Sequence, residues 1–362
     1  MSYIYWLVLF SVLTLGKAAE TYPKLHADRN GKYSILPDTG AVIILSMILI
    51  LVSGLRYNVG TDYFVYYRWS IKEWHQVWDK LLSFKEGGFA LVAMLSRLIY
   101  NHGQSLIFLS AVITVGLFSW TIYKYSIMYL ISILLYIFIG EWQSSFNTMR
   151  QCMAAAILFS GHRFILDRKL WQYSLVVLAA SMFHITALIM IIPYFLLNRK
   201  ADLVQIIILT LGAVAIRFSY DIIFSLISGY KERVLNSNQS YMSNGVNIIR
   251  ILVSFIPIVI YTVLCKKNNQ TKEQNFYINA LLFNAFSLLA GMGSKYFGRV
   301  AIYTGAMVTI GYGHLFQLID DERTRKITAF VVMLMYFIFW LYSLNVSGRD
   351  IRYYQWIFAA GE

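Results

Sequence analysis

Several short segments of this 362-residue chain carry residue types that bind anions or move protons. In RYNVGTDYFVYYRW, Arg56, Asp62 and Arg68 surround a glycine–threonine turn and a run of aromatic residues that includes Tyr63. Arginine binds phosphate oxygens bidentately, and a helix N-terminus behind such a turn favours an anion. The aromatic residues alone are more typical of a belt at a membrane surface. The arginines, the aspartate and the turn together favour a phosphate site with rings available to stack on sugars.

The segment EWQSSFNTMRQCMAAA predicts a second contact for an anion. Arg150 follows an expected Asn147 cap by three residues, so it lies in the first turn of an apolar helix. A cation there opposes the helix dipole, because the N-terminus is already positive. We therefore interpret Arg150 and Gln151 as anion ligands, in preference to a structural pair between Arg150 and Glu141.

Three more candidates come from other segments. ASMFHITALIMIIP holds His184 in a short turn, where it is either a packing residue or a proton carrier near neutral pH. GMGSKYFGR holds Tyr296 and Arg299 at a glycine turn, for which a flexible turn with snorkelling basic side chains is the alternative. Glu86, in EGGFALV, adds a second carboxylate to Asp62.

The elements that must position these residues are transmembrane helices. The chain is 58% hydrophobic and 14% charged, with a mean hydropathy of +0.58. An average soluble domain is roughly 45–50% apolar and about 25% charged, and one soluble core stops growing near ~250–300 residues. These values exclude a soluble enzyme, a disordered protein and a disulfide scaffold. Cys152 and Cys265 lie in apolar stretches without the spacing of a metal site.

We expect an all-α, polytopic bundle of about twelve transmembrane helices that forms a single integral domain over residues 1–362. The expected spans are 2–16, 39–55, 105–123, 126–140, 149–166, 170–182, 185–198, 203–217, 246–265, 275–292, 299–318 and 327–345. The apolar stretch 88–101 is shorter and carries Arg97, so we expect it to be an interfacial or re-entrant helix.

The chain carries 31 Lys and Arg against 18 Asp and Glu, a formal net charge of +13. Short, dense basic connectors are typical of the cytoplasmic side of a membrane, and long loops translocate largely regardless of charge. The long loops 56–87 and 218–245 are therefore expected outside. With this topology about half of the basic residues lie on the outer side, beside carboxylates and aromatic residues. That distribution indicates an anionic substrate at the outer face.

The segments RYNVGTDYFVYY, EGGFALV, SSFNTMRQCMAAAILFSG and ASMFHITALIMIIPYFLL, in this order, resemble the pattern of the EpsG family. This family belongs to the Wzy-type polysaccharide polymerases of bacterial envelopes. The resemblance is close over about residues 50–200 and rests on hydropathy elsewhere. It implies a glycosyltransferase of the bacterial cytoplasmic (inner) membrane that extends exopolysaccharide, capsule or O-antigen chains at the periplasmic or extracellular face. Donor and acceptor would be undecaprenyl-pyrophosphate-linked oligosaccharides. A chain-length regulator and a flippase of the same pathway are the implied partners.

The resemblance places these residues in the family's polar positions, the last two loosely: Arg56, Asp62, Glu86, Arg150, Gln151, His184, Tyr296 and Arg299. Glycosyl transfer passes through an oxocarbenium-like state. Its pyrophosphate leaving group needs charge stabilisation, which arginines supply without a metal. Asp62, Glu86 and His184 are the candidate bases for the acceptor hydroxyl, and the two carboxylates are favoured. The chain has no Walker A, GxGxxG, DxD or HExxH motif, so we expect no nucleotide donor, cofactor, metal or nucleic acid.

Two other classes of protein remain open. A flippase or transporter for lipid-linked oligosaccharides also needs cations and many spans, but it favours a central charged cavity and repeat symmetry. An O-antigen-type ligase shares nearly all the chemistry of a polymerase and differs only in the acceptor. An acyl transferase is less favoured, because the expected cytoplasmic loops are short.

Overall fold

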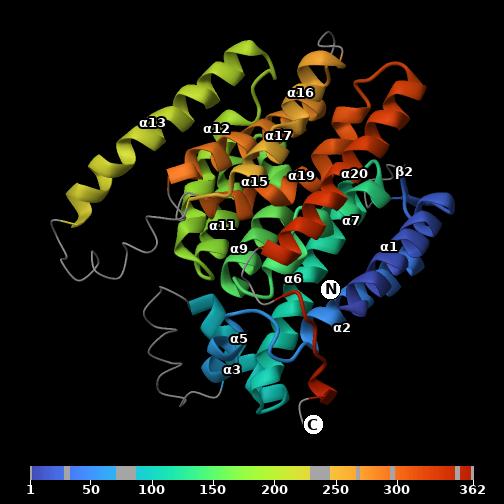
Figure 1. The fold of residues 1–362 in the computed structure, drawn as a ribbon, viewed down its shortest axis with the longest axis vertical. Helices are drawn as coiled ribbons and strands as arrows, with labels where there is room; N and C mark the ends of the chain where they lie inside the picture. Colours follow the sequence, from blue (N-terminus) through green and yellow to red (C-terminus); the bar gives the residue numbers. More distant parts are fainter. Residues whose placement is uncertain are drawn as a thin grey trace.

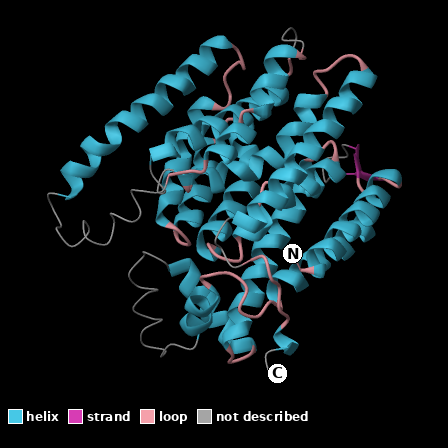
Figure 2. Cartoon of the chain, viewed as in Figure 1, coloured by secondary structure: helices cyan, strands magenta, loops and turns pink. Residues whose placement is uncertain are grey.

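The computed structural model describes residues 2–27, 33–70, 87–228, 245–265, 270–293, 298–346 and 351–359. These residues form a bundle of helices with one small antiparallel hairpin, β1 (Lys24–Ala27) and β2 (Tyr33–Leu36) (Figures 1 and 2). The α-helices of the first half are α1 (Tyr3–Thr21), α2 (Thr39–Gly54), α3 (Tyr63–Ser70), α5 (Gly87–Ile99), α6 (Gly103–Tyr125), α7 (Tyr129–Phe138), α8 (Glu141–Ser144), α9 (Met149–Ser160), α10 (His162–Leu166) and α11 (Leu170–Ser181). Those of the second half are α12 (Ile192–Leu196), α13 (Leu203–Ser228), α15 (Ile248–Ser254), α16 (Ile256–Val263), α17 (Lys272–Ala290), α19 (Val300–Phe316) and α20 (Glu322–Val346). Three 3-10 helices, η1 (Ile185–Ile191), η2 (Gly291–Gly293) and η3 (Ile357–Ala359), complete the described elements.

The predicted all-α class is confirmed, and each expected apolar stretch coincides with one helix or with two consecutive helices. Within the described ranges, α1, α6 and α20 are long and apolar enough to cross a membrane, and several other apolar helices are shorter. The expected total of twelve spans is therefore not confirmed. The stretch 88–101 forms the helix α5.

Some expected spans are divided into two consecutive helices. Helix α9 ends at Gly161, where an added Cβ would lie 2.7 Å from the side chain of Val176 on α11. Helix α15 gives way to α16 at Phe255, just before Pro257 in the first turn of α16. Proline lacks the amide proton that an uninterrupted helix would use there.

The centre of the bundle is α19, whose residues from Ala301 to Phe316 are all buried. A helix that is apolar on every side belongs in the interior. Helix α19 packs against α17, α9 and α7 (Figure 1). A smaller cluster joins α3, α5 and α6, and in it Tyr63, Tyr66 and Trp69 are buried. Much of the aromatic run after Asp62 is therefore packing.

Connectors that were expected on one side of the membrane meet at one end of the bundle. At the end with the expected cytoplasmic connectors, Arg163 forms an ion pair with Glu273, and Asn279 donates to the carbonyls of the 197–199 connector. At the other end, the Gly88 amide donates to the Met182 carbonyl at 3.0 Å. We call this second end the site end. The side of the membrane that it faces stays a prediction, as does the single-domain organisation.

The two long loops expected at the site end are partly helical. Helix α3 occupies the start of loop 56–87, and α13 extends to Ser228, into loop 218–245. The remaining parts of these loops, 71–86 and 229–244, lie outside the described residues.

Candidate functional site

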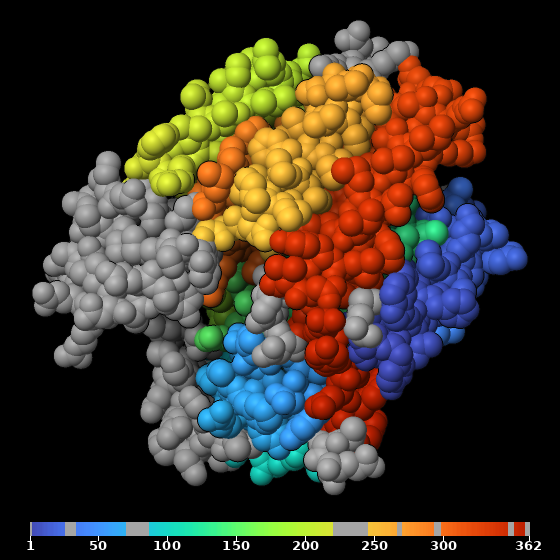
Figure 3. Space-filling model, in the orientation of Figure 1, coloured from blue at the N-terminus to red at the C-terminus, as the bar shows by residue number. Residues whose placement is uncertain are grey.

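A cavity of about 770 Å³ opens at the site end. Its polar lining comes from the turn before α3, α8, the start of α9, α15, the start of α19 and α20: Thr61, Asp62, Gln143, Asn147, Thr148, Asn247, Arg250, Arg299, Tyr342 and Ser343. Its apolar lining comes mostly from α19 and α20 and includes Ile302, Phe339, Trp340 and Leu344. Figure 3 shows this face of the molecule hollowed between α15, α20 and α5. An apolar wall with a few convergent polar groups is the usual form of a ligand site.

The turn before α3 places Asp62 in this cavity. Gly60 has φ +96°, a conformation that favours glycine. The Asn147 Oδ1 atom accepts hydrogen bonds from Thr61 Oγ1 at 3.1 Å and from the Asp62 amide at 3.4 Å. The expected helix cap at Asn147 is wrong, because Thr148 occupies the N-cap position of α9, without a capping hydrogen bond from its side chain, and the Asn147 side chain instead holds the turn. Arg150 still lies in the first turn of α9.

The carboxylate of Asp62 lies within electrostatic reach of two arginines. Partial burial raises the pKa of Asp62, while a hydrogen bond from Thr61 and the charges of Arg299 and Arg150 act in the opposite direction. The side chain of Arg150 is also hydrogen-bonded to Tyr66 on α3. Three predicted site residues that are distant in sequence, Asp62, Arg150 and Arg299, therefore come together around the turn.

Gln151 and His184 are connected to this group through α19. The Gln151 Nε2 atom donates to the Arg299 carbonyl at 2.8 Å, which holds the start of α19 against α9. The Tyr303 hydroxyl, one turn further along α19, is hydrogen-bonded to Gln151 and lies 3.3 Å from His184 Nδ1. The same His184 atom lies 2.8 Å from Thr186 Oγ1. Among the described residues, Asp62 and Arg299 line the cavity themselves, whereas Arg150, Gln151 and His184 do not.

The other predicted residues lie outside this group. The buried guanidinium of Arg56 donates to the carbonyls of Ser53 and Phe146, and it lies 4.8 Å from the centre of the Phe146 ring. The buried Tyr63 hydroxyl donates to Gln104 Oε1 at 2.6 Å. Arg68 is exposed on α3 and donates to the Phe64 carbonyl. Glu86 and Tyr296 lie outside the described residues.

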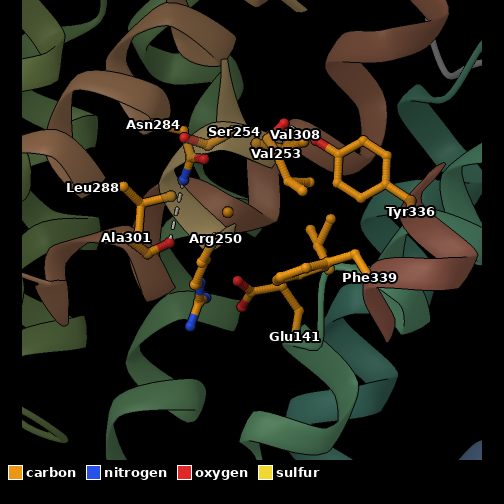
Figure 4. A pocket seen from close by; sticks show the side chains of 12 residues that line it. Glu141, Arg250, Val253, Ser254, Asn284, Leu288, Ala301, Val308, Tyr336 and Phe339 are labelled. Atoms are coloured by element: carbon orange, nitrogen blue, oxygen red, sulfur yellow. Dashed lines mark hydrogen bonds between the residues drawn. The ribbon is translucent and has the colours of Figure 1, made fainter. Parts of the chain in front are cut away.

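Arg250, on α15, is a charged residue of the cavity that the sequence motifs did not predict. Its side chain lies beside the carboxylate of Glu141, which points toward it (Figure 4). A signal was present in the sequence, because NIIR repeats the spacing of NTMR, in which an asparagine precedes an arginine by three residues. Here the asparagine is a true cap, since Asn247 Oδ1 accepts from the Ile249 amide at 2.8 Å.

The fold and the site define a helical membrane protein with arginines and carboxylates around a part-apolar cavity at one end of its bundle. The chain belongs to the EpsG family, whose sequence pattern matches residues 41–357. The match extends beyond the expected residues 50–200 and covers the C-terminal half, including Arg250 and Arg299. This membership indicates a membrane protein of the polysaccharide polymerase type. No curated protein and no solved structure matches the chain.

Proposed function

We propose that this protein is a polysaccharide polymerase that transfers a growing glycan from undecaprenyl pyrophosphate to a hydroxyl of a lipid-linked repeat unit. The observation that carries the proposal is that Asp62 and Arg299 line a cavity with an apolar wall, and that Arg150 lies within electrostatic reach of Asp62. Such a cavity suits a ligand with an anionic head and a hydrocarbon chain, because the arginines bind phosphate and the wall accepts the chain. Membership in the EpsG family supports the same class of substrate.

In the proposed reaction, the bond between the anomeric carbon of the donor glycan and the pyrophosphate oxygen breaks. The acceptor hydroxyl oxygen forms the new glycosidic bond, and its proton passes to a base. The products are a longer lipid-linked glycan and undecaprenyl pyrophosphate. Arg150 and Arg299 stabilise the negative charge that develops on the leaving pyrophosphate.

Among the candidate bases, we propose Asp62, because it lines the cavity and lies within electrostatic reach of Arg299 and Arg150. Burial raises the pKa of Asp62, which makes its carboxylate a stronger base toward the acceptor hydroxyl. His184 would help to hold α19 in place through its contact with Tyr303, and it would not touch the substrate. Glu86 stays a candidate base on the sequence argument alone. Arg56 and Tyr63 would hold the segment that carries Asp62, while Arg68 would contact substrate only from the exposed side of α3.

The proposed location is the bacterial cytoplasmic membrane, with the cavity facing the periplasm or the exterior. This orientation is supported by the short, dense basic connectors at the end opposite to the cavity, because such connectors are typical of the cytoplasmic side of a membrane.

The proposal is tested by incubating the purified protein with native lipid-linked repeat units and measuring the product sizes by gel electrophoresis and mass spectrometry. We expect a ladder of products that grow by whole repeats. Arg323→Ala, an exposed arginine at the opposite end, serves as the control and keeps the ladder. Transbilayer movement of repeat units in vesicles without any ladder would instead identify a flippase. A single transfer to an acceptor that is not a repeat unit would identify a ligase.

A further inference from the structure

Arg250 borders two neighbouring cavities. It lines the main cavity of about 770 Å³ together with Asn247 and Arg299. It also lines a smaller adjoining pocket of about 30 Å³, together with Glu141 and Asn284. The side chain is partly exposed, so one guanidinium borders both spaces.

In the smaller pocket, Glu141 is the electrostatic partner of Arg250 (Figure 4). Glu141 is 3% exposed. Burial of a carboxylate is strongly unfavourable unless a charged or hydrogen-bonding partner compensates for the lost water. Arg250 supplies a positive charge at this point, and Glu141 in turn fixes where that charge lies.

The helix α19 is shaped to receive the Glu141 carboxylate. A Cβ atom at Gly305 would lie 2.1 Å from Glu141 Oε1. Any larger residue at position 305 would therefore displace the carboxylate, because real Cβ contacts are never that short. The Glu141 carboxylate therefore lies between Gly305 on α19 and Arg250, which borders the main cavity.

We propose that Arg250 is an anion-binding residue of the main cavity and that Glu141, seated against Gly305, is the residue that positions it. Guanidinium has five N–H donors, so a carboxylate on one side leaves donors for an anion on the other. On the proposed function, that anion is the pyrophosphate of a lipid-linked substrate. A polymerase holds a donor and an acceptor, each with its own pyrophosphate, and Arg250 stands on a different helix from Arg150 and Arg299.

The test measures binding of inorganic pyrophosphate to the purified full-length protein in detergent by isothermal titration calorimetry. We expect Arg250→Ala to weaken pyrophosphate binding at least tenfold. Arg250→Lys keeps the charge but loses the planar fork, so an intermediate loss is expected. Glu141→Gln keeps the shape of the side chain and removes its charge, and we expect it to weaken pyrophosphate binding three- to tenfold.

Gly305→Ala separates positioning from charge, because it keeps both ionised groups and moves the carboxylate. We expect it to reproduce the loss caused by Glu141→Gln. The matched control is Gly212→Ala on α13, where an added Cβ meets nothing within 4 Å. This control should bind pyrophosphate like the wild type. Thermal unfolding and elution volume identify the variants that fold, and Arg250→Lys replaces Arg250→Ala if the alanine variant does not.

The result that would overturn the inference is a folded Arg250 variant with unchanged pyrophosphate affinity, or a wild type that does not bind pyrophosphate. A purely structural ion pair would give lower unfolding temperatures without a change in pyrophosphate affinity, which also overturns it. The proposed function fails separately. A wild type that binds pyrophosphate through Arg250 but makes no polymer leaves this inference standing and rejects the polymerase.

Discussion

Replacing Gly60 by alanine tests whether the turn before α3 positions Asp62 for the reaction. Gly60 has φ +96°, and an added Cβ would lie 2.7 Å from Asn147 Oδ1 and 2.8 Å from the Phe146 carbonyl oxygen. Asn147 is buried, and it is the residue that accepts hydrogen bonds from Thr61 and from the Asp62 amide. The new methyl group therefore pushes against the atoms that hold the turn.

The size of the effect follows from these contacts. A left-handed conformation costs a residue with a Cβ about 1–2 kcal/mol. An ordinary C···O contact is about 3.3 Å, so the turn must move by roughly 0.5 Å to relieve the two short contacts. Since a misplacement of about 1 Å can cost about 10²-fold in rate, we expect Gly60→Ala to slow polymer formation about tenfold or more. The unfolding temperature should fall only modestly, because the turn is a small part of the molecule.

The assay is the rate of polymer formation from lipid-linked repeat units, measured beside the unfolding temperature of the same preparation. Gly116→Ala in α6, where nothing lies within 4 Å of the added Cβ, is the matched control and should keep the wild-type rate. A Gly60→Ala enzyme that folds and polymerises at the wild-type rate would refute the view that this turn sets the position of Asp62.

The remaining predictions concern three charged residues of the site end. Arg150→Ala should abolish high-molecular-weight polymer while the protein still inserts into membranes, as judged by gel electrophoresis of the glycan and by membrane fractionation; polymer of normal length would exclude the role. Because burial raises the pKa of Asp62 and the proposed base must be deprotonated, the polymerisation rate should fall on acidification, at a higher pH than an unperturbed aspartate would give; an Asp62→Asn enzyme with the same pH profile as the wild type would place the base elsewhere. Arg56→Ala leaves the Ser53 and Phe146 carbonyls without their donor, which should cost about 1–3 kcal/mol of stability; an unchanged unfolding temperature would contradict this structural role.

The positions of the helices could be predicted from the sequence, whereas their divisions could not. A long apolar stretch must satisfy its own backbone hydrogen bonds in a membrane, so helices follow from composition alone. At Gly161, where α9 gives way to α10, the side chain of Val176 on α11 approaches closely, and no local pattern reveals this contact. The length of each continuous helix, and so whether it can cross a membrane, is therefore harder to predict than the presence of a helix.

The sequence predicts which residues lie at the same end of the bundle, because successive membrane spans place their connectors alternately on the two sides of the membrane. The expected topology predicts Asp62, Arg150 and Arg299 at one end, and the structure places both arginines within electrostatic reach of Asp62. The direction in which a side chain points could not be predicted in the same way. Arg56 turns inward to the backbone of Phe146, between α8 and α9, and nothing in its neighbours along the chain indicates this. Arg250 lies within an expected span, and its partner Glu141 is more than a hundred residues away.

The carboxylate of Asp62 beside the arginines of the site affects how readily the pyrophosphate product is released. A polymerase must release undecaprenyl pyrophosphate after each transfer, and a cavity with arginines alone would hold this product tightly. Asp62 lies near Arg150 and Arg299 and repels an incoming anion, so it limits the affinity of the site for pyrophosphate. Asp62→Asn should therefore bind inorganic pyrophosphate several-fold more tightly than the wild type while it polymerises more slowly. Weaker binding by Asp62→Asn would show that Asp62 orients the arginines toward the anion, and the argument from product release would then be wrong.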